Sequence, residues 1–558
     1  MLQTLKPVPL AVAVCLALAS PDNVANDALR LHQQDRQHEE DERQRKRLRQ
    51  LQRNHTVAEP APPPATPIES SPETTCLAIS GLRIGGNQQI SPEAINQALA
   101  TVASDCMNDR QVNRLLKAIT DLYLREGYIG ARPYLVSPLA DGATLDILIV
   151  EGFVESVELS DPDLPLSLAS AFPDLLGRPL LLRDLEQGLD QLNRLRTFDL
   201  SADIEPGQLS GGSRIVIRPR SRPQRWSLGA TLDNRGGLQT GRNRGTVSLS
   251  LDSPLQLNDY VRVSASRTLS QGPAYSRSAG LHYSIPYGPW TLGLSANRLE
   301  YTGSIPGTRF QTSGNSTFYS LDIERALWRD QRTLLSASAN LSRKSIDSFF
   351  FNRRIALQSP TLLVAQTGLD LLWIGNGIWT ARLGFAQGLQ GAGADERPAQ
   401  PNLPNPQFRK YLGNITYTRQ DLWLGMPWQS SSTLNLQYSR DLLPPLEQQL
   451  LTDDSAVRGW RRQSVTSASA AVWRNTLSLP IRFDPQLQAT PHLGVDLAWG
   501  KASTQAPQRR LAGAHTGMNF SWPGGQLELD YQKSLKERSK QPLDPEPGYW
   551  LMTLSLQI

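Results

Sequence analysis

The feature that most constrains this chain is a period-two alternation that runs from about residue 226 to residue 558. In "TVSLSLD" the apolar residues Val247, Leu249 and Leu251 alternate with threonine, serine and aspartate. The segments "YVRVSASR", "WTLGLSAN", "STLNLQYS" and "YWLMTLSLQI" repeat the pattern. Because successive side chains of a strand point to opposite faces, each segment predicts a strand with one apolar face and one small or polar face.

Many such strands of roughly 10 residues are typical of a transmembrane β-barrel. At about 20 residues per strand and turn, the region 223–558 has room for about 16 antiparallel strands. Hydrophobic residues make up only 39% of the chain. Beyond the N-terminus it has no apolar run of about 18 residues, so a helical membrane span is not expected. A large soluble β-sandwich or propeller also has alternating strands and remains the alternative fold.

The first residues predict export from the cytoplasm. Lys6 is followed by the apolar run "PVPLAVAVCLALAS", which ends near the small-residue pattern Ala17-Leu18-Ala19. This arrangement predicts a secretory signal peptide over residues 1–19, and a short buried helix is the alternative. Cys15 lies inside the apolar run and would be removed with the signal.

The mature chain then retains Cys76 and Cys106. Two cysteines in an exported chain favour one disulfide, and two unpaired buried thiols are the alternative. A bridge would close a loop of roughly 30 residues and stabilise the fold by about 3 kcal/mol in the chain-entropy model.

Residues 23–53 are almost entirely polar and rich in helix formers, with acidic residues preceding basic ones, an order that suits the helix dipole. No continuous apolar stripe is present, so a helix here would lie in solvent or in a wet polar cavity, and a disordered charged tail is the alternative. Residues 54–75 are rich in proline and alanine and predict an extended linker.

Two small α+β units are predicted next, over 76–152 and 153–222. The first shows a strand, two helices and two further strands, and its first helix begins at the N-cap candidate Ser91. The second shows the same order of elements. Two consecutive units with one element order predict a tandem repeat of a small domain.

These segments together resemble the two-partner secretion outer-membrane transporters of the TpsB type, which export haemolysins and filamentous haemagglutinin. The block "LDNRGG…TG…DSPLQLND" resembles the first barrel hairpin of that family, and "AVRGWRRQSV" and "WRNTLSLP" follow in the family order. The tandem units resemble its periplasmic polypeptide-transport-associated (POTRA) domains. The segments 23–53 and 54–75 resemble its plug helix and linker, so the resemblance covers almost the whole mature chain.

The resemblance implies a role for the stretch "SAVRGW". In the family, the sixth extracellular loop folds back into the barrel lumen, and an arginine at its tip pairs with an acid on the barrel wall. Here Val457, Arg458, Gly459 and Trp460 would form that tip. The matching acid is Asp496 in "GVDLA", where glycine and alanine replace the family's flanking residues. A solvated loop arginine is the alternative for Arg458.

The resemblance also implies the function and the partners. The chain is expected in the Gram-negative outer membrane with its N-terminal domains in the periplasm. It would export a TpsA-type exoprotein (an adhesin, a haemolysin or a contact-dependent toxin) recognised through its N-terminal secretion domain. The barrel assembly machinery and outer-membrane lipid would be further partners. An insertase that assembles other barrels is the alternative, although such relatives usually carry more periplasmic repeats.

Nothing in the sequence points to an enzyme, a cofactor or a nucleic-acid partner. The six histidines lack a spacing such as HExxH, and no GxSxG motif is present, so no catalytic residue and no metal site is predicted. The basic stretch "RQRKRLR" lies in a mixed-charge segment behind an export signal. The net charge of +5 is small for 558 residues and does not argue for nucleic acid.

Overall fold

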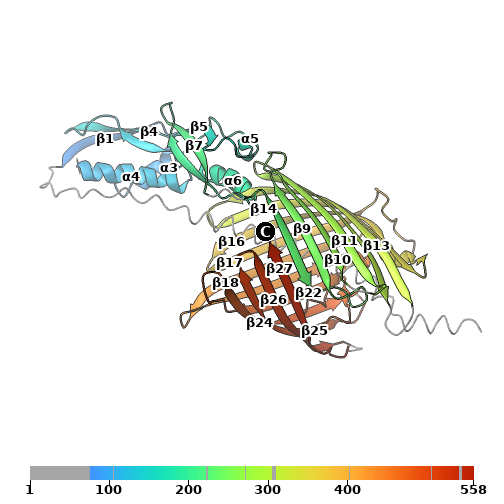
Figure 1. Cartoon of the computed structure of the whole chain (residues 1–558). Coiled ribbons are helices and arrows are strands. Elements are labelled where there is room, and N and C mark those ends of the chain that lie inside the picture. Colours follow the sequence, from blue (N-terminus) through green and yellow to red (C-terminus); the bar gives the residue numbers. More distant parts are fainter. Residues whose placement is uncertain are drawn as a thin grey trace, which may run out of the picture.

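The computed structural model describes residues 76–558 apart from 105, 221–223, 270–271, 305–309, 401–402, 504 and 540–542. The predicted signal peptide (1–19), plug helix (23–53) and linker (54–75) lie outside the described residues. Two small α+β units lead into one large barrel (Figure 1). Of the helices described, none has the length and apolarity needed to cross a membrane.

The first unit packs two helices on a mixed four-stranded sheet. Its elements are β1 (Leu77–Gly85), α3 (Pro92–Leu99), β2 (Cys106–Met107), α4 (Asp109–Arg125), β3 (Arg132–Leu135) and β4 (Ala143–Val150), and the sheet order is β2-β1-β4-β3. Ser91 caps α3 by accepting a hydrogen bond from the Ala94 N–H. The sequence did not predict β2, because two residues are too few to show an alternation.

The second unit has the element order that the sequence predicted. It comprises β5 (Phe153–Leu159), α5 (Leu168–Ala171), α6 (Leu182–Asn193), β6 (Leu200–Pro206) and β7 (Gly212–Pro219), in a sheet of order β5-β7-β6. The apolar face of α6 packs on this sheet through residues such as Leu185, Leu189 and Leu192. A bridge between Tyr128 and Leu181 joins the two units.

The remaining strands close an antiparallel barrel, which confirms the predicted fold class and excludes the soluble alternatives. Its long strands are β8 (Trp226–Asp233), β9 (Arg244–Asp252), β10 (Tyr260–Thr268), β11 (Tyr275–Tyr287), β12 (Trp290–Ser304), β13 (Gln311–Arg329), β14 (Thr333–Phe350), β16 (Thr361–Gly375), β17 (Gly377–Leu389), β18 (Arg409–Trp423), β19 (Met426–Tyr438), β22 (Ser469–Ser478), β24 (Gln488–Lys501), β25 (Arg509–Trp522), β26 (Gly525–Arg538) and β27 (Tyr549–Gln557). Within the described residues these sixteen strands complete the ring, with β27 paired to β8. The two-residue strands β15 (Arg353–Arg354) and β23 (Ile481–Arg482) extend it locally.

The alternation along each strand separates an outer from an inner face. On β24, Leu493, Val495 and Leu497 are exposed, whereas Asp496 between them is fully buried. An outward apolar row and an inward polar row are what a barrel wall needs between lipid and a wet lumen. The two-residue period of the strand therefore places Asp496 on the lumen side.

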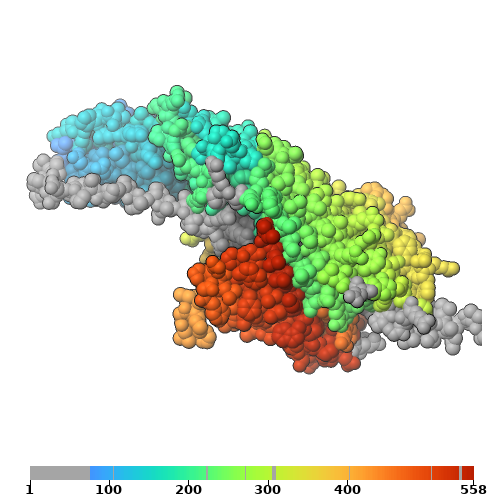
Figure 2. All heavy atoms as spheres, viewed as in Figure 1, coloured from blue at the N-terminus to red at the C-terminus, as the bar shows by residue number. Residues whose placement is uncertain are grey.

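The second unit lies directly against the barrel (Figure 2). Its contact there includes the turn between β9 and β10. The Asn258 side chain accepts a hydrogen bond from Ser167 N–H at 3.0 Å and donates to the Ser167 carbonyl and the Ser170 hydroxyl, both at 2.7 Å. Asn258 has a φ of 59°, a conformation that asparagine tolerates better than most residues. The block "DSPLQLND" thus supplies part of the barrel surface that the second unit contacts.

Two arginines add charged contacts to this junction. Arg194, at the end of α6, donates to the Ser284 hydroxyl at 2.8 Å and to the Asn258 carbonyl at 2.9 Å. Burial lowers the pKa of Arg194 to about 10, against the raising effect of Asp252 nearby, so the side chain remains a cation at neutral pH. On the barrel side, Arg329 forms an ion pair with Asp190 of α6.

Candidate functional site

The candidate site centres on residues 439–468, the segment between β19 and β22, named here the lumen loop. It contains the short helix η2 (Pro445–Glu447) and a small hairpin of β20 (Gln449–Leu450) and β21 (Thr466–Ser467). Its apolar side chains are buried and pack against the inner wall. The cluster contains Leu451, Ala456, Val457, Trp460 and Val465 of the loop and Val472, Ala498 and Leu511 of the strands. The segment is therefore folded inside the barrel as part of its core.

Arg458 of the lumen loop contacts Asp496 of β24 through a two-pronged ion pair. Arg458 Nε lies 2.6 Å from Asp496 Oδ2, and Arg458 Nη2 lies 2.7 Å from Asp496 Oδ1. The Arg458 backbone N–H adds a third hydrogen bond to Oδ2 at 3.1 Å. The planar guanidinium matches the carboxylate, and shielding from water strengthens such a pair over a surface one.

The other residues of the loop tip explain how Arg458 reaches the wall. Gly459 has a φ of 98°, and its backbone N–H donates to Gln532 Oε1 at 3.3 Å. Trp460 is fully buried, and its Nε1–H donates to the Ala512 carbonyl at 2.9 Å. Val457, also fully buried, fills the adjoining apolar space. The tip is thus fixed by backbone shape, by an indole hydrogen bond and by packing.

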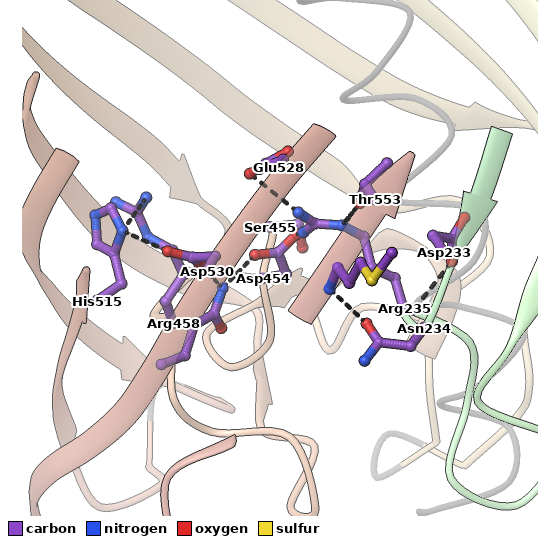
Figure 3. A network of polar contacts seen from close by, with 12 residues as sticks. Asp233, Asn234, Arg235, Asp454, Ser455, Arg458, His515, Glu528, Asp530 and Thr553 are labelled. Carbon is purple, nitrogen blue, oxygen red and sulfur yellow. Dashed lines mark hydrogen bonds and ion pairs between the residues drawn. The ribbon is translucent and has the colours of Figure 1, made fainter. Parts of the chain in front are cut away.

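A second contact joins the lumen loop to the stretch "LDNRGG", which spans the end of β8 and the turn after it (Figure 3). Arg235 pairs with Asp454 of the loop and lies 3.1 Å from Glu528 of β26. In return, Arg461 Nη2 of the loop donates to the backbone carbonyls of Asn234 at 2.6 Å and Gly236 at 2.8 Å. The two sequence blocks that carried the family resemblance therefore contact each other.

A third contact lies across the lumen, at Glu447 in η2. Its carboxylate Oε1 is 2.6 Å from Lys344 Nζ of β14, and its Oε2 is 2.8 Å from Lys410 Nζ of β18. All three residues are buried: Glu447 is 2% exposed and each lysine is 5% exposed. The Glu447 carboxylate gives each buried lysine an ion-pair partner and holds the N-terminal part of the lumen loop against the wall.

A fourth contact comes from Glu546, in the segment between β26 and β27. Its carboxylate accepts hydrogen bonds from the consecutive backbone N–H groups of Arg461, Arg462 and Gln463, at 2.8, 2.8 and 3.0 Å. Glu546 thus holds the three residues that directly follow the loop tip.

The structure brings together the loop-tip and wall residues that the sequence predicted, and it pairs the two cysteines. It brings Arg458 and Asp496 into direct contact, and it places Val457, Gly459 and Trp460 beside them. It joins Cys76 to Cys106 in a disulfide with Cα atoms 5.5 Å apart, far from the lumen in the first unit. The transport role of these residues remains a prediction.

Sequence reasoning missed the contacts of Glu447, Arg235 and Glu546. The sequence did contain a usable signal for the contact of Glu447. Lys344 and Lys410 lie on strands whose residues alternate between outward and inward, and both occupy inward positions, where a buried lysine needs an anion. The partner of these lysines could not be named from the sequence, because Glu447 is separated from Lys344 by more than a hundred residues.

Comparisons with known proteins agree with this arrangement. The model of the family "Haemolysin secretion/activation protein ShlB/FhaC/HecB" matches residues 211–520, and two POTRA models match residues 77–152 and 153–206. The chain is 33% identical to the haemolysin transporter protein ShlB of Serratia marcescens over 522 residues, which cover 90% of this chain and 89% of that protein. It is 32% identical to the haemolysin transporter protein HpmB of Proteus mirabilis, covering 87% and 86% of the two chains.

The solved structure of CdiB from Escherichia coli has the same fold. It superimposes with a TM-score of 0.84 at 24% identity, over 96% of this chain and 99% of that one. A family model that spans more than half of the chain and a relative at 33% identity over nine-tenths of it settle the classification. The chain therefore belongs to the ShlB/FhaC/HecB family of haemolysin secretion/activation proteins, as its sequence motifs indicated.

Proposed function

We propose that this protein is the outer-membrane translocator of a two-partner secretion system and exports a large exoprotein. The observation that carries the proposal is the lumen loop, held inside a closed barrel by the Arg458–Asp496 pair and by three further polar contacts. A barrel that serves only as a passive pore has no need of such a loop or of two periplasmic POTRA units. Family membership favours secretion over the insertase alternative.

The POTRA units supply a surface on which an unfolded partner can be received. In the first unit β3 lies at the end of the sheet, and Tyr134 of β3 pairs in register with Leu148 of β4. Both side chains are exposed, as is Val136 just beyond β3. An extended peptide added beside β3 would gain main-chain hydrogen bonds and cover these apolar groups, the mode called β-augmentation. The incoming exoprotein segment is the proposed occupant.

The path onward runs under the second unit into the barrel. A cavity of about 320 Å³ lies between α6 and the inner face of the strands, from Tyr260 on β10 to Arg382 on β17. Its walls carry hydroxyl, amide and charged side chains, among them Ser284, Asn297 and Asn340. A wall of this kind tolerates many side-chain types and binds none of them tightly, which suits a chain of varied sequence in transit.

The segment 23–53 is the proposed plug of this path. The support is its sequence: a polar, helix-forming stretch of about 45 Å when helical, at 1.5 Å per residue, that exposes little apolar surface when it moves. Our hypothesis is that it leaves the lumen during secretion. Disulfide-locking the segment to an inward-facing barrel position should stop export, and normal export with the lock verified would refute the plug.

The cargo is proposed to be an adhesin, a haemolysin or a contact-dependent toxin. The barrel itself would be inserted by the barrel assembly machinery, and its outward apolar residues, such as Leu493 and Leu497, would contact outer-membrane lipid. No nucleotide supply is proposed, because folding of the exoprotein outside the cell can give the transport its direction.

The test is export of a candidate exoprotein encoded beside this gene. Arg458→Ala is compared with wild type and with Arg462→Ala, a matched control because Arg462 lies in the same loop with its side chain exposed. We expect Arg458→Ala to abolish export at an unchanged level of folded barrel, and Arg462→Ala to export normally. Full export by Arg458→Ala would contradict the assigned role of the lumen loop.

A further inference from the structure

Three side chains of the barrel wall converge beside the Arg458–Asp496 pair, and the transport mechanism uses none of them. They are His492 on β24, His515 on β25 and Asp530 on β26, and Figure 3 shows the latter two close to Arg458. His492 Nε2 and His515 Nδ1 both lie 3.2 Å from Asp530 Oδ1. The three ligand-type atoms lie within 4.8 Å of one another, and two of the three residues are buried.

The register of the strands creates room for this cluster through two glycines. Gly517 on β25 pairs with His492 on one side and with Asp530 on the other. A Cβ on Gly517 would lie 2.7 Å from His492 Nε2, so the imidazole occupies the space that a side chain would need. Gly494 plays the same part for His515, because a Cβ there would overlap His515 Nε2.

Outer hydrogen bonds orient two of the three groups. Gln532 Nε2 donates to Asp530 Oδ2 at 2.6 Å, which leaves Oδ1 directed at the two imidazoles. Thr476 Oγ1 lies 3.4 Å from His515 Nε2, so the Nδ1 atom of that ring faces Asp530. Such partners fix the orientation of metal ligands in known sites.

We propose that His492, His515 and Asp530 form a binding site for a divalent transition-metal ion of the zinc class. Two imidazole nitrogens and one carboxylate are a donor set that suits Zn²⁺, with water in the fourth position of a tetrahedron. The two spacings to Asp530 Oδ1, 3.2 Å each, are close to the edge of a tetrahedron with bonds of about 2.0–2.1 Å. The site does not depend on the proposed function, and its test is a binding measurement.

Metal binding at this place is linked to the position of the lumen loop. Arg458 Nη1 lies 3.4 Å from His515 Nδ1, the atom that would bind the ion. The lone pair of this nitrogen can bind a metal or accept a hydrogen bond from Arg458, but not both. The guanidinium charge also repels a cation. Docking of the lumen loop and binding of the ion therefore oppose each other, and the opposition is reciprocal.

The test is titration of the purified, tag-free full chain in detergent with Zn²⁺, followed by calorimetry. Co²⁺ serves as a second probe, since its visible absorption reports a tetrahedral nitrogen and oxygen site. His492→Ala and His515→Gln are the site variants. His282→Ala is the matched control, because His282 on β11 is hydrogen-bonded to Ser295 at 3.0 Å and lies outside the cluster. Heat-modifiable migration on a gel verifies that each variant is a folded barrel.

We expect one Zn²⁺ per chain in wild type and in His282→Ala, and affinity at least about tenfold weaker in both site variants. Arg458→Ala should bind Zn²⁺ roughly fivefold or more tightly than wild type, because the competing cation is gone. Equal affinity in wild type and in folded His492→Ala, or no binding in wild type, would overturn the site. Unchanged affinity in Arg458→Ala would overturn the link to the lumen loop.

Discussion

Gly459 lies directly against the backbone of Lys533 on β26. A Cβ added to Gly459 would overlap the Lys533 peptide group, and its φ of 98° already disfavours any other residue. On the neighbouring strand β25, Gly513 gives the same clearance to the carbonyl oxygen of Arg458. The loop tip can approach the wall closely enough for Arg458 to reach Asp496 only because both positions lack a side chain.

Gly459→Ala should therefore release the loop tip. Backbone strain of about 1–3 kcal/mol adds to the steric overlap with Lys533, so we expect loss of export with the barrel still folded. Gly391→Ala is the control, because Gly391 also has a positive φ, 106°, but has open space around its Cβ position. Equal export defects in the two variants would mean that strain, rather than contact with the wall, is responsible.

Glu447→Gln should loosen the N-terminal part of the lumen loop from the barrel wall. The change leaves Lys344 and Lys410 buried without an anion, and breaking a buried pair typically costs about 3–5 kcal/mol. The measurement is the labelling rate of Ser455→Cys by a membrane-impermeant maleimide. Ser455 is buried in the loop, Cys76 and Cys106 are joined in the disulfide, and Cys15 is expected to leave with the predicted signal peptide. We expect faster labelling than in Glu396→Gln, which changes an exposed acid. Identical labelling rates would argue against Glu447 as an anchor.

Asn258→Ala should weaken the contact between the second POTRA unit and the barrel. It removes three hydrogen bonds to Ser167 and Ser170 from a buried side chain. Hydrogen exchange is expected to accelerate in α5 and in the β9–β10 turn. Gln256→Ala is the control, because Gln256 is exposed in the same turn with the same φ of 59°. If the control accelerates exchange equally, the effect belongs to the turn conformation and not to the contacts with Ser167.

Replacing Cys76 and Cys106 by serine should destabilise the first POTRA unit alone. The bridge closes a loop with a sequence separation of 30 residues, and its loss is worth about 3 kcal/mol in the chain-entropy model. We expect faster hydrogen exchange in β1 and β2, where Ala78 pairs with Cys106, and unchanged exchange in the barrel strands. Unchanged exchange in β1 would show that the sheet holds this register without the bridge.

The barrel could be predicted from the sequence because its signal is local. Leu493, Val495 and Leu497 alternate with inward residues, and the period of two is imposed by the geometry of a single strand. The helices of the POTRA units were predictable for the same reason, since Ser91 and the apolar face of α4 act within one or two turns. The two-residue strand β2 has no such repeat and was missed.

The residues of the site also fall into those that the sequence predicts and those that only the tertiary structure brings together. The sequence by itself determined the strands, the tandem units and, through the family resemblance, the pairing expected between Arg458 and Asp496. Only the tertiary structure decided which inward side chains meet across the lumen: Glu447 with Lys344 and Lys410, Arg235 with Asp454, and His492 with Asp530. The physical reason is that a strand fixes which face a side chain takes, whereas its partner depends on barrel closure, on strand register and on a loop folded back between distant strands.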